Sequence, residues 1–308
     1  MKKKVLALLL ATVTAGTFAF AGCNFGGGDN NGDDGGTGGD NGKQHTTHTY
    51  NKQVTEAKYL KSEATVTSKA LYYYSCVCGE KGTQTFEYGE KLAATVGLDY
   101  TLNDNKTEYS VTGIGTATDT DIIIAAEIEG KPVTRIEDQA FKECSGLTSV
   151  IIPDSIALIG SKAFYKCSGL TSVTIPDSVT MIVEDAFYNC SGLTSVTILC
   201  ANAIIASRAF MNCTALTSVM IPDGMENISP IMFGGCSALT SITLPNSVTN
   251  FGYAAFRDCI GLTEIIFKGT KAQWEAIFKN ASWNENTGDF IVTCADGTKL
   301  DKDGNEIA

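Results

Sequence analysis

Residues 163–190 read AFYKCSGLTSVTIPDSVTMIVEDAFYNC, and this phrase recurs with small changes between Val133 and Lys268. It consists of Ala-Phe, a gap of two residues, a Cys, and a Leu-x-x-Val-x-Ile run that ends at Pro. Two series of residues keep a spacing of 23: Phe141, Phe164, Phe187, Phe210, Phe233 and Phe256, and Cys144, Cys167, Cys190, Cys213, Cys236 and Cys259. A strict period of this length indicates coils that stack because none can bury its apolar face alone.

One coil shows why stacking is needed. Pro176 ends a short strand because proline lacks the N–H for the next ladder bond. Burying a large apolar side chain contributes roughly 1.5–3 kcal/mol, but ordering each residue costs roughly 1–2 kcal/mol, so a single coil is unstable and a stack is stable. The inward positions of this coil are Leu170, Val173, Ile175, Val179, Ile182, Ala186, Phe187 and Cys190.

The repeat resembles that of the BspA-like bacterial leucine-rich repeat family, which reads Leu-x-x-Val-x-Ile-Pro-x-Ser-Val-x-x-Ile-x-x-x-Ala-Phe-x-x-Cys. The match covers about residues 98–300, including an entry segment at 109–115 and an exit segment at 269–274. The resemblance implies a β-rich repeat solenoid of right-handed leucine-rich-repeat coils of 23 residues, with a parallel β-sheet on the concave face and a cap at both ends. It also implies a surface or secreted protein that binds macromolecules of a host or a neighbouring cell.

The repeats are predicted to span residues 137–268. Leu199 and Cys200 replace the Pro-Asp pair, Met232 replaces the Ala, and Lys268 stands in a Pro position, which marks the end of the array.

Caps are predicted at 91–136 and 269–308. The first contains strands on both sides of a turn at 103–106, with 122–124 in place of a first coil strand. The second has helical character around Trp274 and Ile277. Both tryptophans fall in this cap, so we expect them to pack, and the residues expected to cover the last coil are Trp283, Phe290 and Val292.

Residues 1–22 are interpreted as a lipoprotein signal peptide, with a basic start followed by an apolar run. The segment 20–23, Phe-Ala-Gly-Cys, is similar to a lipobox, although Phe20 departs from the usual Leu. We expect lipidation of Cys23, with secretion after cleavage behind Ala21 as the alternative. Residues 23–43 form a Gly/Asp/Asn tether. The expected location is the extracellular face of the cytoplasmic membrane, contacted only through the lipid.

Residues 44–90 form a predicted small β module with His45, His48, Cys76 and Cys78. Four such ligands suit tetrahedral zinc, but Cys-x-Cys is tighter than the usual Cys-x-x-Cys spacing. We therefore expect two partly buried thiols beside surface histidines in a β-hairpin, and zinc is the alternative.

The chain has 11 cysteines. Six occupy one equivalent site per coil, where stacked parallel side chains could form a disulfide only with strain. We expect these six to be buried, reduced apolar fillers. Cys200 in a turn and Cys294 in the cap are expected to be accessible.

The outward strand residues are the candidate ligand-binding surface. Serines and threonines dominate them, and we expect their stacked hydroxyls to hydrogen-bond one another. Ile151, Met220 and Ile266 are the apolar candidates for contact. The alternative is a surface that a strand merely presents to water. The predicted binding residues are Ile151, Thr174, Thr197, Met220, Thr243 and Ile266.

Composition excludes several functions. The net charge is −11, and removal of the three lysines of residues 1–22 gives −11 − 3 = −14, which argues against nucleic acid as a partner. Both histidines lie outside the repeats, so the solenoid lacks an imidazole base and is not expected to be an enzyme. We expect a noncatalytic monomer, without a cofactor in the solenoid, that binds a protein or other macromolecule on another cell or a host surface. A structural spacer is the alternative, and a tethered hydrolase is the third reading.

Overall fold

The structure is a computed structural model that describes residues 60–62, 70–75, 81–88 and 92–307. The chain divides into a small unit, whose described residues are 60–62, 70–75 and 81–88, and a large unit, whose described residues are 92–307. The predicted lipidation site and zinc ligands lie outside the described residues, so these predictions stay untested: Cys23, His45, His48, Cys76 and Cys78.

The small unit is an antiparallel sheet in the order β1-β2-β3. Aromatic and β-branched residues are frequent in β2 and β3, which is typical of strands. Within the described residues of this module, β2 and β3 therefore pair as an antiparallel hairpin, and the predicted surroundings of the thiols and histidines stay a prediction. The strands are β1 (Leu60–Ser62), β2 (Ala70–Ser75) and β3 (Lys81–Tyr88).

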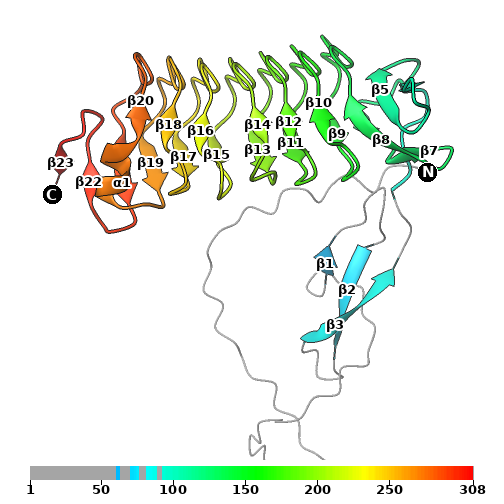
Figure 1. Cartoon of the computed structure of the whole chain (residues 1–308), viewed down its shortest axis with the longest axis horizontal. Coiled ribbons are helices and arrows are strands. Elements are labelled where there is room, and N and C mark those ends of the chain that lie inside the picture. The colour runs from blue at the N-terminus through cyan, green and yellow to red at the C-terminus, as the bar shows by residue number, and fades with distance from the viewer. Residues whose placement is uncertain (1–59, 63–69, 76–80, 89–91, 308) are drawn as a thin grey trace, which may run out of the picture. The chain divides into compact units, whose positions relative to one another are not determined.

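The large unit is a solenoid with one uninterrupted ten-stranded sheet, called the long sheet below (Figure 1). Its strands pair in parallel from β6 to β21, and successive repeats match in register, as Val173 matches Val196. The last strands turn back in antiparallel pairs. The strands are β6 (Asp121–Ile123), β9 (Ser149–Ile151), β11 (Ser172–Ile175), β13 (Ser195–Ile198), β15 (Ser218–Met220), β17 (Ser241–Leu244), β19 (Glu264–Phe267), β21 (Ile291–Cys294), β22 (Lys299–Leu300) and β23 (Glu306–Ile307).

A second line of strands, only two residues long from β10 onward, runs along the coils and is called the broken sheet (Figure 1). It comprises a seven-stranded sheet that ends at β14 and a three-stranded sheet that begins at β16. The strands are β4 (Asp99–Leu102), β5 (Tyr109–Gly113), β7 (Glu127–Ile128), β8 (Lys131–Ile136), β10 (Leu158–Ile159), β12 (Met181–Ile182), β14 (Ile204–Ile205), β16 (Asn227–Ile228), β18 (Asn250–Phe251) and β20 (Phe278–Lys279).

The core of the solenoid contains the repeated phenylalanines. All six are fully buried, and each ring stacks on the next with centroids between 5.0 Å and 5.8 Å apart. The Leu, Val and Ile positions of the coil are buried around them. Each coil thus shares its apolar face with two neighbours, which confirms the stacked solenoid that the 23-residue period predicts.

The C-terminal cap is itself a modified coil. Helix α1 (Lys271–Ala276) starts at a capping box between Thr270 and Gln273. Beyond it β20 pairs with β18 and β21 with β19, so the stack continues past Lys268, where the sequence marked its end. The inserted helix lengthens the period, because Glu264 matches Ile291, 27 residues later. Its aromatic residues pack as expected, with Trp274 buried and in edge contact with Trp283.

Candidate interaction surfaces

The outer face of the long sheet carries two rows of outward side chains in register. All six predicted binding positions lie on this face. Thr174, Thr197 and Met220 are exposed and Thr243 is half-buried. The first row is Ser149, Ser172, Ser195, Ser218, Ser241, Glu264 and Ile291, and the second is Ile151, Thr174, Thr197, Met220, Thr243, Ile266 and Thr293.

The hydroxyls of these two rows do not hydrogen-bond one another, contrary to the prediction. Neighbouring strands lie about 4.8 Å apart, which exceeds the reach of a hydroxyl hydrogen bond between two short side chains. Among the described residues, only Ser149 makes a side-chain bond, by donating to the Asp121 carboxylate at 2.7 Å. The remaining hydroxyls of the two rows are free to bond with water or a ligand.

A different hydroxyl row forms a ladder that the sequence reasoning missed. Each of these threonines directly precedes a long-sheet strand, and its Oγ1 donates to the threonine carbonyl of the preceding coil, as Thr194 does to Thr171 at 3.0 Å. These hydroxyls are therefore satisfied by the protein backbone. The ladder comprises Thr148, Thr171, Thr194, Thr217, Thr240 and Thr263.

Apolar side chains on the outer face gather toward its C-terminal half. Met220 is 61% exposed and Ile266 is 39% exposed, with Thr243 between them in register. Ile151 lies three strands away on β9 and is half-buried. Ile291, 40% exposed beside Glu264, extends the apolar region and was not predicted. Phe290, Ile291 and Val292 are consecutive apolar residues, so the sequence carries no alternation that marks Ile291 as outward.

The repeated cysteines form a second ladder, in which their thiols donate hydrogen bonds. The Cys190 Sγ donates to the carbonyl of Phe164 at 3.1 Å, and that carbonyl also accepts the Cys167 amide. Cys167, Cys213, Cys236 and Cys259 repeat this contact with the Phe carbonyl of the preceding coil. The thiols thus link successive coils, a role beyond the apolar filling expected of them.

Burial makes these thiols weak acids. It raises the pKa of Cys190 and of Cys259 to about 12. The pKa of Cys213 lies well above its ordinary value for the same reason, with a smaller contribution from the neighbouring thiols. A thiol that stays protonated at neutral pH is neither a nucleophile nor a metal ligand.

Three predictions about cysteine accessibility are corrected. Cys200 and Cys294, which were expected to be accessible, are 1% and 3% exposed. Cys144, expected to be buried, is half-buried because it belongs to the first repeat. Cys200 is buried because its turn lies one residue later than the turns of the neighbouring coils.

The coil that contains β13 and β14, called the fourth coil, places its turn one residue later than the third coil, with β11 and β12, and the fifth coil, with β15 and β16. In the third coil the Val179 amide donates to Pro176, whereas in the fourth the Ala203 amide donates to Cys200. Asn202 holds the sequence position that Val179 holds one coil earlier, and burying its amide without partners would be costly. The displacement keeps Asn202 exposed and moves Cys200 and Ala203 inward.

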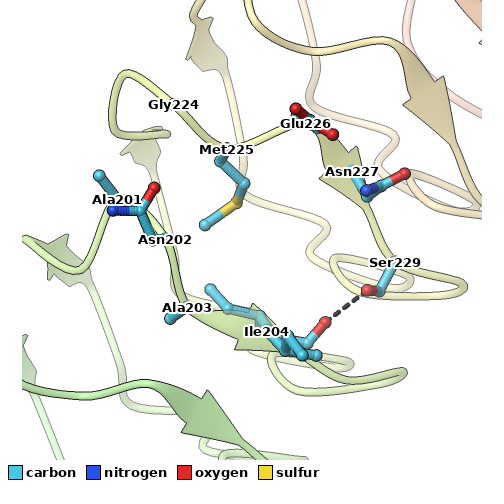
Figure 2. Close-up of a pocket in the computed structure, with 10 residues that line it drawn as sticks. Ala201, Asn202, Ala203, Ile204, Gly224, Met225, Glu226, Asn227 and Ser229 are labelled. Atoms are coloured by element: carbon cyan, nitrogen blue, oxygen red, sulfur yellow. Dashed lines mark hydrogen bonds between the residues drawn. The ribbon is translucent and has the colours of Figure 1, made fainter.

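The break in the broken sheet follows this coil and is called the seam, defined by the facing edges of β14 and β16. A hollow of about 280 Å³ occupies it. Figure 2 shows Met225 pointing into the hollow from one coil and Ile204 at its lower side, while the Ser229 hydroxyl donates to the Ile205 carbonyl. The hollow is lined by Ala201, Asn202, Ala203, Ile204, Ile205, Gly224, Met225, Glu226, Asn227 and Ser229.

The described part of the chain offers no constellation for catalysis. It contains no histidine and no group of three or more His, Cys, Asp or Glu side chains that could hold a metal ion. Within the same residues, no helix has the length and apolar character needed to cross a bilayer.

Comparisons with known proteins agree with this architecture. The family model for the BspA type leucine rich repeat region matches residues 123–203 and 203–287, in six copies. A leucine rich repeat protein of T. pallidum is 27% identical with a TM-score of 0.51, covering 55% of this chain and 78% of that one. A leucine rich cell surface protein of Faecalibacterium prausnitzii is 28% identical with a TM-score of 0.51, covering 71% of this chain and 61% of that one. No curated protein sequence matches the chain.

Proposed function

The chain belongs to the BspA-type leucine-rich repeat family, and from this premise we propose that it is a noncatalytic cell-surface protein whose solenoid binds a protein on a host or neighbouring cell. Repeats of this family are typically protein-interaction modules. A similar solved structure is described as a cell surface protein. The family thus supports protein binding, and the partner and its location are our proposal.

The proposal rests on the outer face of the long sheet, which combines free hydroxyls with exposed apolar side chains. Its free hydroxyls can accept and donate hydrogen bonds to a partner without breaking bonds inside the protein, because none of them is used in the ladder. Met220, Ile266 and Ile291 add apolar area that a partner would remove from water. An extended surface of this kind suits a macromolecule better than a small ligand.

A binding experiment tests this face directly. Fluorescently labelled full-length protein is titrated onto cultured host epithelial cells and onto neighbouring bacterial cells. The double variant Met220→Lys with Ile266→Lys is expected to bind at least about tenfold more weakly, because it places two charges in the contact region. The matched control is Phe278→Lys on the broken sheet, where Phe278 is 65% exposed.

The outcomes separate the two function classes. Saturable binding that the double variant loses and Phe278→Lys retains supports the proposal. An absence of saturable binding by the wild type to either cell type contradicts it and favours a structural spacer. Equal binding by all three proteins places the contact elsewhere and contradicts the outer face.

We also propose that the protein is anchored through a lipid on Cys23, with secretion as the alternative. The support is the apolar run that ends in Phe-Ala-Gly-Cys and the Gly/Asp/Asn tether behind it. Metabolic labelling with an alkyne fatty acid should mark the wild type and leave Cys23→Ser unmarked. Equal labelling of both proteins, or of neither, contradicts lipidation at Cys23.

We propose no cofactor for the solenoid. Zinc at His45, His48, Cys76 and Cys78 remains the alternative for the small module. Metal analysis of the purified full-length protein decides whether the small module binds zinc. Less than about half an equivalent of zinc per chain contradicts the metal site.

A further inference from the structure

The turns that lead from the broken sheet back to the long sheet form a ridge along the solenoid. In the fifth coil this turn lies between β16 and β17. One position on the ridge, directly after the buried Phe of each coil, carries a side chain in every repeat except the fifth, where Gly234 occupies it. The row at this position is Lys142, Tyr165, Tyr188, Met211, Gly234 and Arg257.

Gly234 and Gly235 leave a hollow of about 140 Å³ in this row, called the notch. It opens between Met211 of the fourth coil and Arg257 of the sixth. A cavity of roughly 150 Å³ holds one benzene molecule, whereas pockets for drug-sized ligands measure roughly 300–1,000 Å³. The notch therefore has the size of a single aromatic ring.

The same row shows how an aromatic ring is held on the ridge. The rings of Tyr165 and Tyr188 stack with centroids 5.0 Å apart. The Asn212 amide, 24 residues after Tyr188, donates to the Tyr188 hydroxyl at 3.4 Å. Asp258 follows Gly234 at the same separation and lines the notch. A tyrosine ring in the notch would thus meet a carboxylate where Tyr188 meets an amide, and a phenol hydroxyl can donate to it.

The walls of the notch also suit a neutral ring. The sulfur of Met211 and the guanidinium of Arg257 both make favourable contacts with aromatic rings. The Arg257 Nε is buried and, among the described residues, has no hydrogen-bond partner. The carboxylates of Asp258 and Glu285 lie 3.5 Å and 3.6 Å from it, so they balance its charge without accepting its hydrogen. This balance disfavours an anionic guest and leaves a donor for a neutral one.

The floor of the notch carries a residue that its backbone disfavours. Ile231 has φ 55°, in the left-handed region, where a β-branched residue is an outlier. Its side chain lies over Gly234, because a Cβ added there would meet the Ile231 Cγ2 at 2.6 Å. Strained residues of this kind concentrate at binding sites. The other repeats place unbranched or small residues in this conformation: Gln139, Lys162, Asp185, Arg208 and Ala254.

We propose that the notch binds one tyrosine side chain of a protein partner, with its ring between Met211 and Arg257 and its hydroxyl donating to the Asp258 carboxylate. Tyrosine is enriched at protein interfaces, where it acts as an anchor in a pocket of the partner. The notch shares no residue with the outer face of the long sheet, so it is an independent contact site.

Methyl NMR of the full-length protein tests the notch with the peptide acetyl-Gly-Tyr-Gly-amide. The chain has 6 methionines, and the ring current of a bound tyrosine should move the Met211 methyl signal upfield. The shift should saturate with a Kd on the order of 1–10 mM, as expected for a single ring. The Met220 methyl, on the long sheet, should not move.

Two further peptides test the chemistry of the guest. Acetyl-Gly-Phe-Gly-amide should bind about two- to tenfold more weakly, because it lacks the hydroxyl that Asp258 would accept. Acetyl-Gly-Leu-Gly-amide has no ring and should cause no upfield shift of Met211.

Two variants and a matched control locate the contact. Gly234→Tyr fills the notch from within, so the Met211 methyl should already lie upfield and the tyrosine peptide should no longer shift it. Ile231→Gln, which copies the residue of the first coil, should weaken binding by about threefold or more because it removes apolar floor. Gly146→Tyr adds the same ring at a glycine with nothing within 4 Å of the added Cβ, and it should retain wild-type affinity.

An unmoved Met211 methyl in the wild type overturns the proposal. Equal responses to the tyrosine and leucine peptides, equal affinity for the tyrosine and phenylalanine peptides, or equal loss in Gly146→Tyr and Gly234→Tyr do the same. If Gly234→Tyr does not fold, Ile231→Gln decides, and wild-type affinity in that variant overturns the proposal. Loss of cell binding by the double variant Met220→Lys with Ile266→Lys would leave these results unchanged, so the two proposals fail separately.

Discussion

The long sheet and the broken sheet are built by the same repeats, one from the first half of each coil and the other from the second. The long sheet runs uninterrupted through ten strands, whereas the broken sheet stops at β14 and resumes at β16. Long-sheet strands span three or four residues in the repeats, and broken-sheet strands span two. The shorter strands of the broken sheet form fewer hydrogen bonds per coil. A single displaced turn can therefore interrupt the broken sheet and leave the long sheet intact.

The fourth coil shows that the long sheet tolerates a displaced turn and the broken sheet does not. Its long-sheet strand β13 pairs with both neighbours in unchanged register, although Leu199 and Cys200 follow it directly. Its broken-sheet strand β14 pairs only with β12. The Leu-x-x-Val-x-Ile run therefore keeps the long sheet in register, while the broken sheet depends on where the turn falls.

The largest expected effect comes from the core that the two sheets share. Phe210 is fully buried and stacks at 5.3 Å on Phe187 and 5.8 Å on Phe233. Phe210→Ala should lower the free energy of unfolding by about 3–5 kcal/mol, since it removes buried area and leaves a cavity. Urea denaturation measures this, with the exposed Phe278→Ala as the control. A loss as small as that of the control would show that the core does not hold the sheets together.

A smaller effect concerns the thiol ladder that links the coils. The folded pKa of Cys190 is about 12 and its ordinary value is 9.0, because burial disfavours the thiolate. The folded state therefore holds this proton longer than the unfolded state does. Its contribution to stability is complete below about pH 9 and is lost as pH rises toward 12, by about 1 kcal/mol per unit of pH.

In Cys190→Ala the free energy of unfolding should therefore fall less steeply between pH 9 and 11, by about 1 kcal/mol per unit of pH. Denaturation at several pH values measures the slope, and Cys144→Ala, at a half-buried thiol, should change it less. Identical slopes in the wild type and Cys190→Ala would mean that the thiol is not buried in the folded protein.

The smallest expected effect comes from a variant designed to make the broken sheet continuous. Leu199→Pro, Cys200→Asp and Asn202→Val together restore the turn of the third coil in the fourth. If Asn202 displaces the turn, this variant should pair β14 with β16 and gain about 0.5–1.5 kcal/mol for each bond restored. Urea denaturation and amide exchange at Asn227 measure the gain. An unchanged exchange rate in a folded triple variant would show that the displaced turn does not cause the seam.

Much of the solenoid could be predicted from the sequence, because the 23-residue period of the repeat indicates which side chains face inward. The Phe stack, the long sheet and the N-terminal turn at 103–106 are as predicted. The modified coil after Lys268 was missed, since helix α1 removes the period on which the prediction relied.

The candidate surfaces could be predicted only in part. Period-two alternation identifies the outward positions of the long sheet, so Met220 and Ile266 were found. Leu199 and Cys200 were recognised as departures from the repeat, but the sequence does not state that the turn moves to keep Asn202 in water. The opening between β14 and β16 depends on the relative positions of two coils, which no single repeat encodes.

Amide exchange of the free protein tests the contrast between the two sheets most directly. Asn227 and Ser229 face the seam, and Asn250 and Gly252 occupy the same positions one coil later, where their amides donate to Glu226 and Ile228. The Asn227 and Ser229 amides are expected to exchange faster than those of Asn250 and Gly252. The amides of β13 and β15 on the long sheet should be protected alike. Equal protection at 227, 229, 250 and 252 would contradict a break between β14 and β16, because the broken sheet would then be continuous.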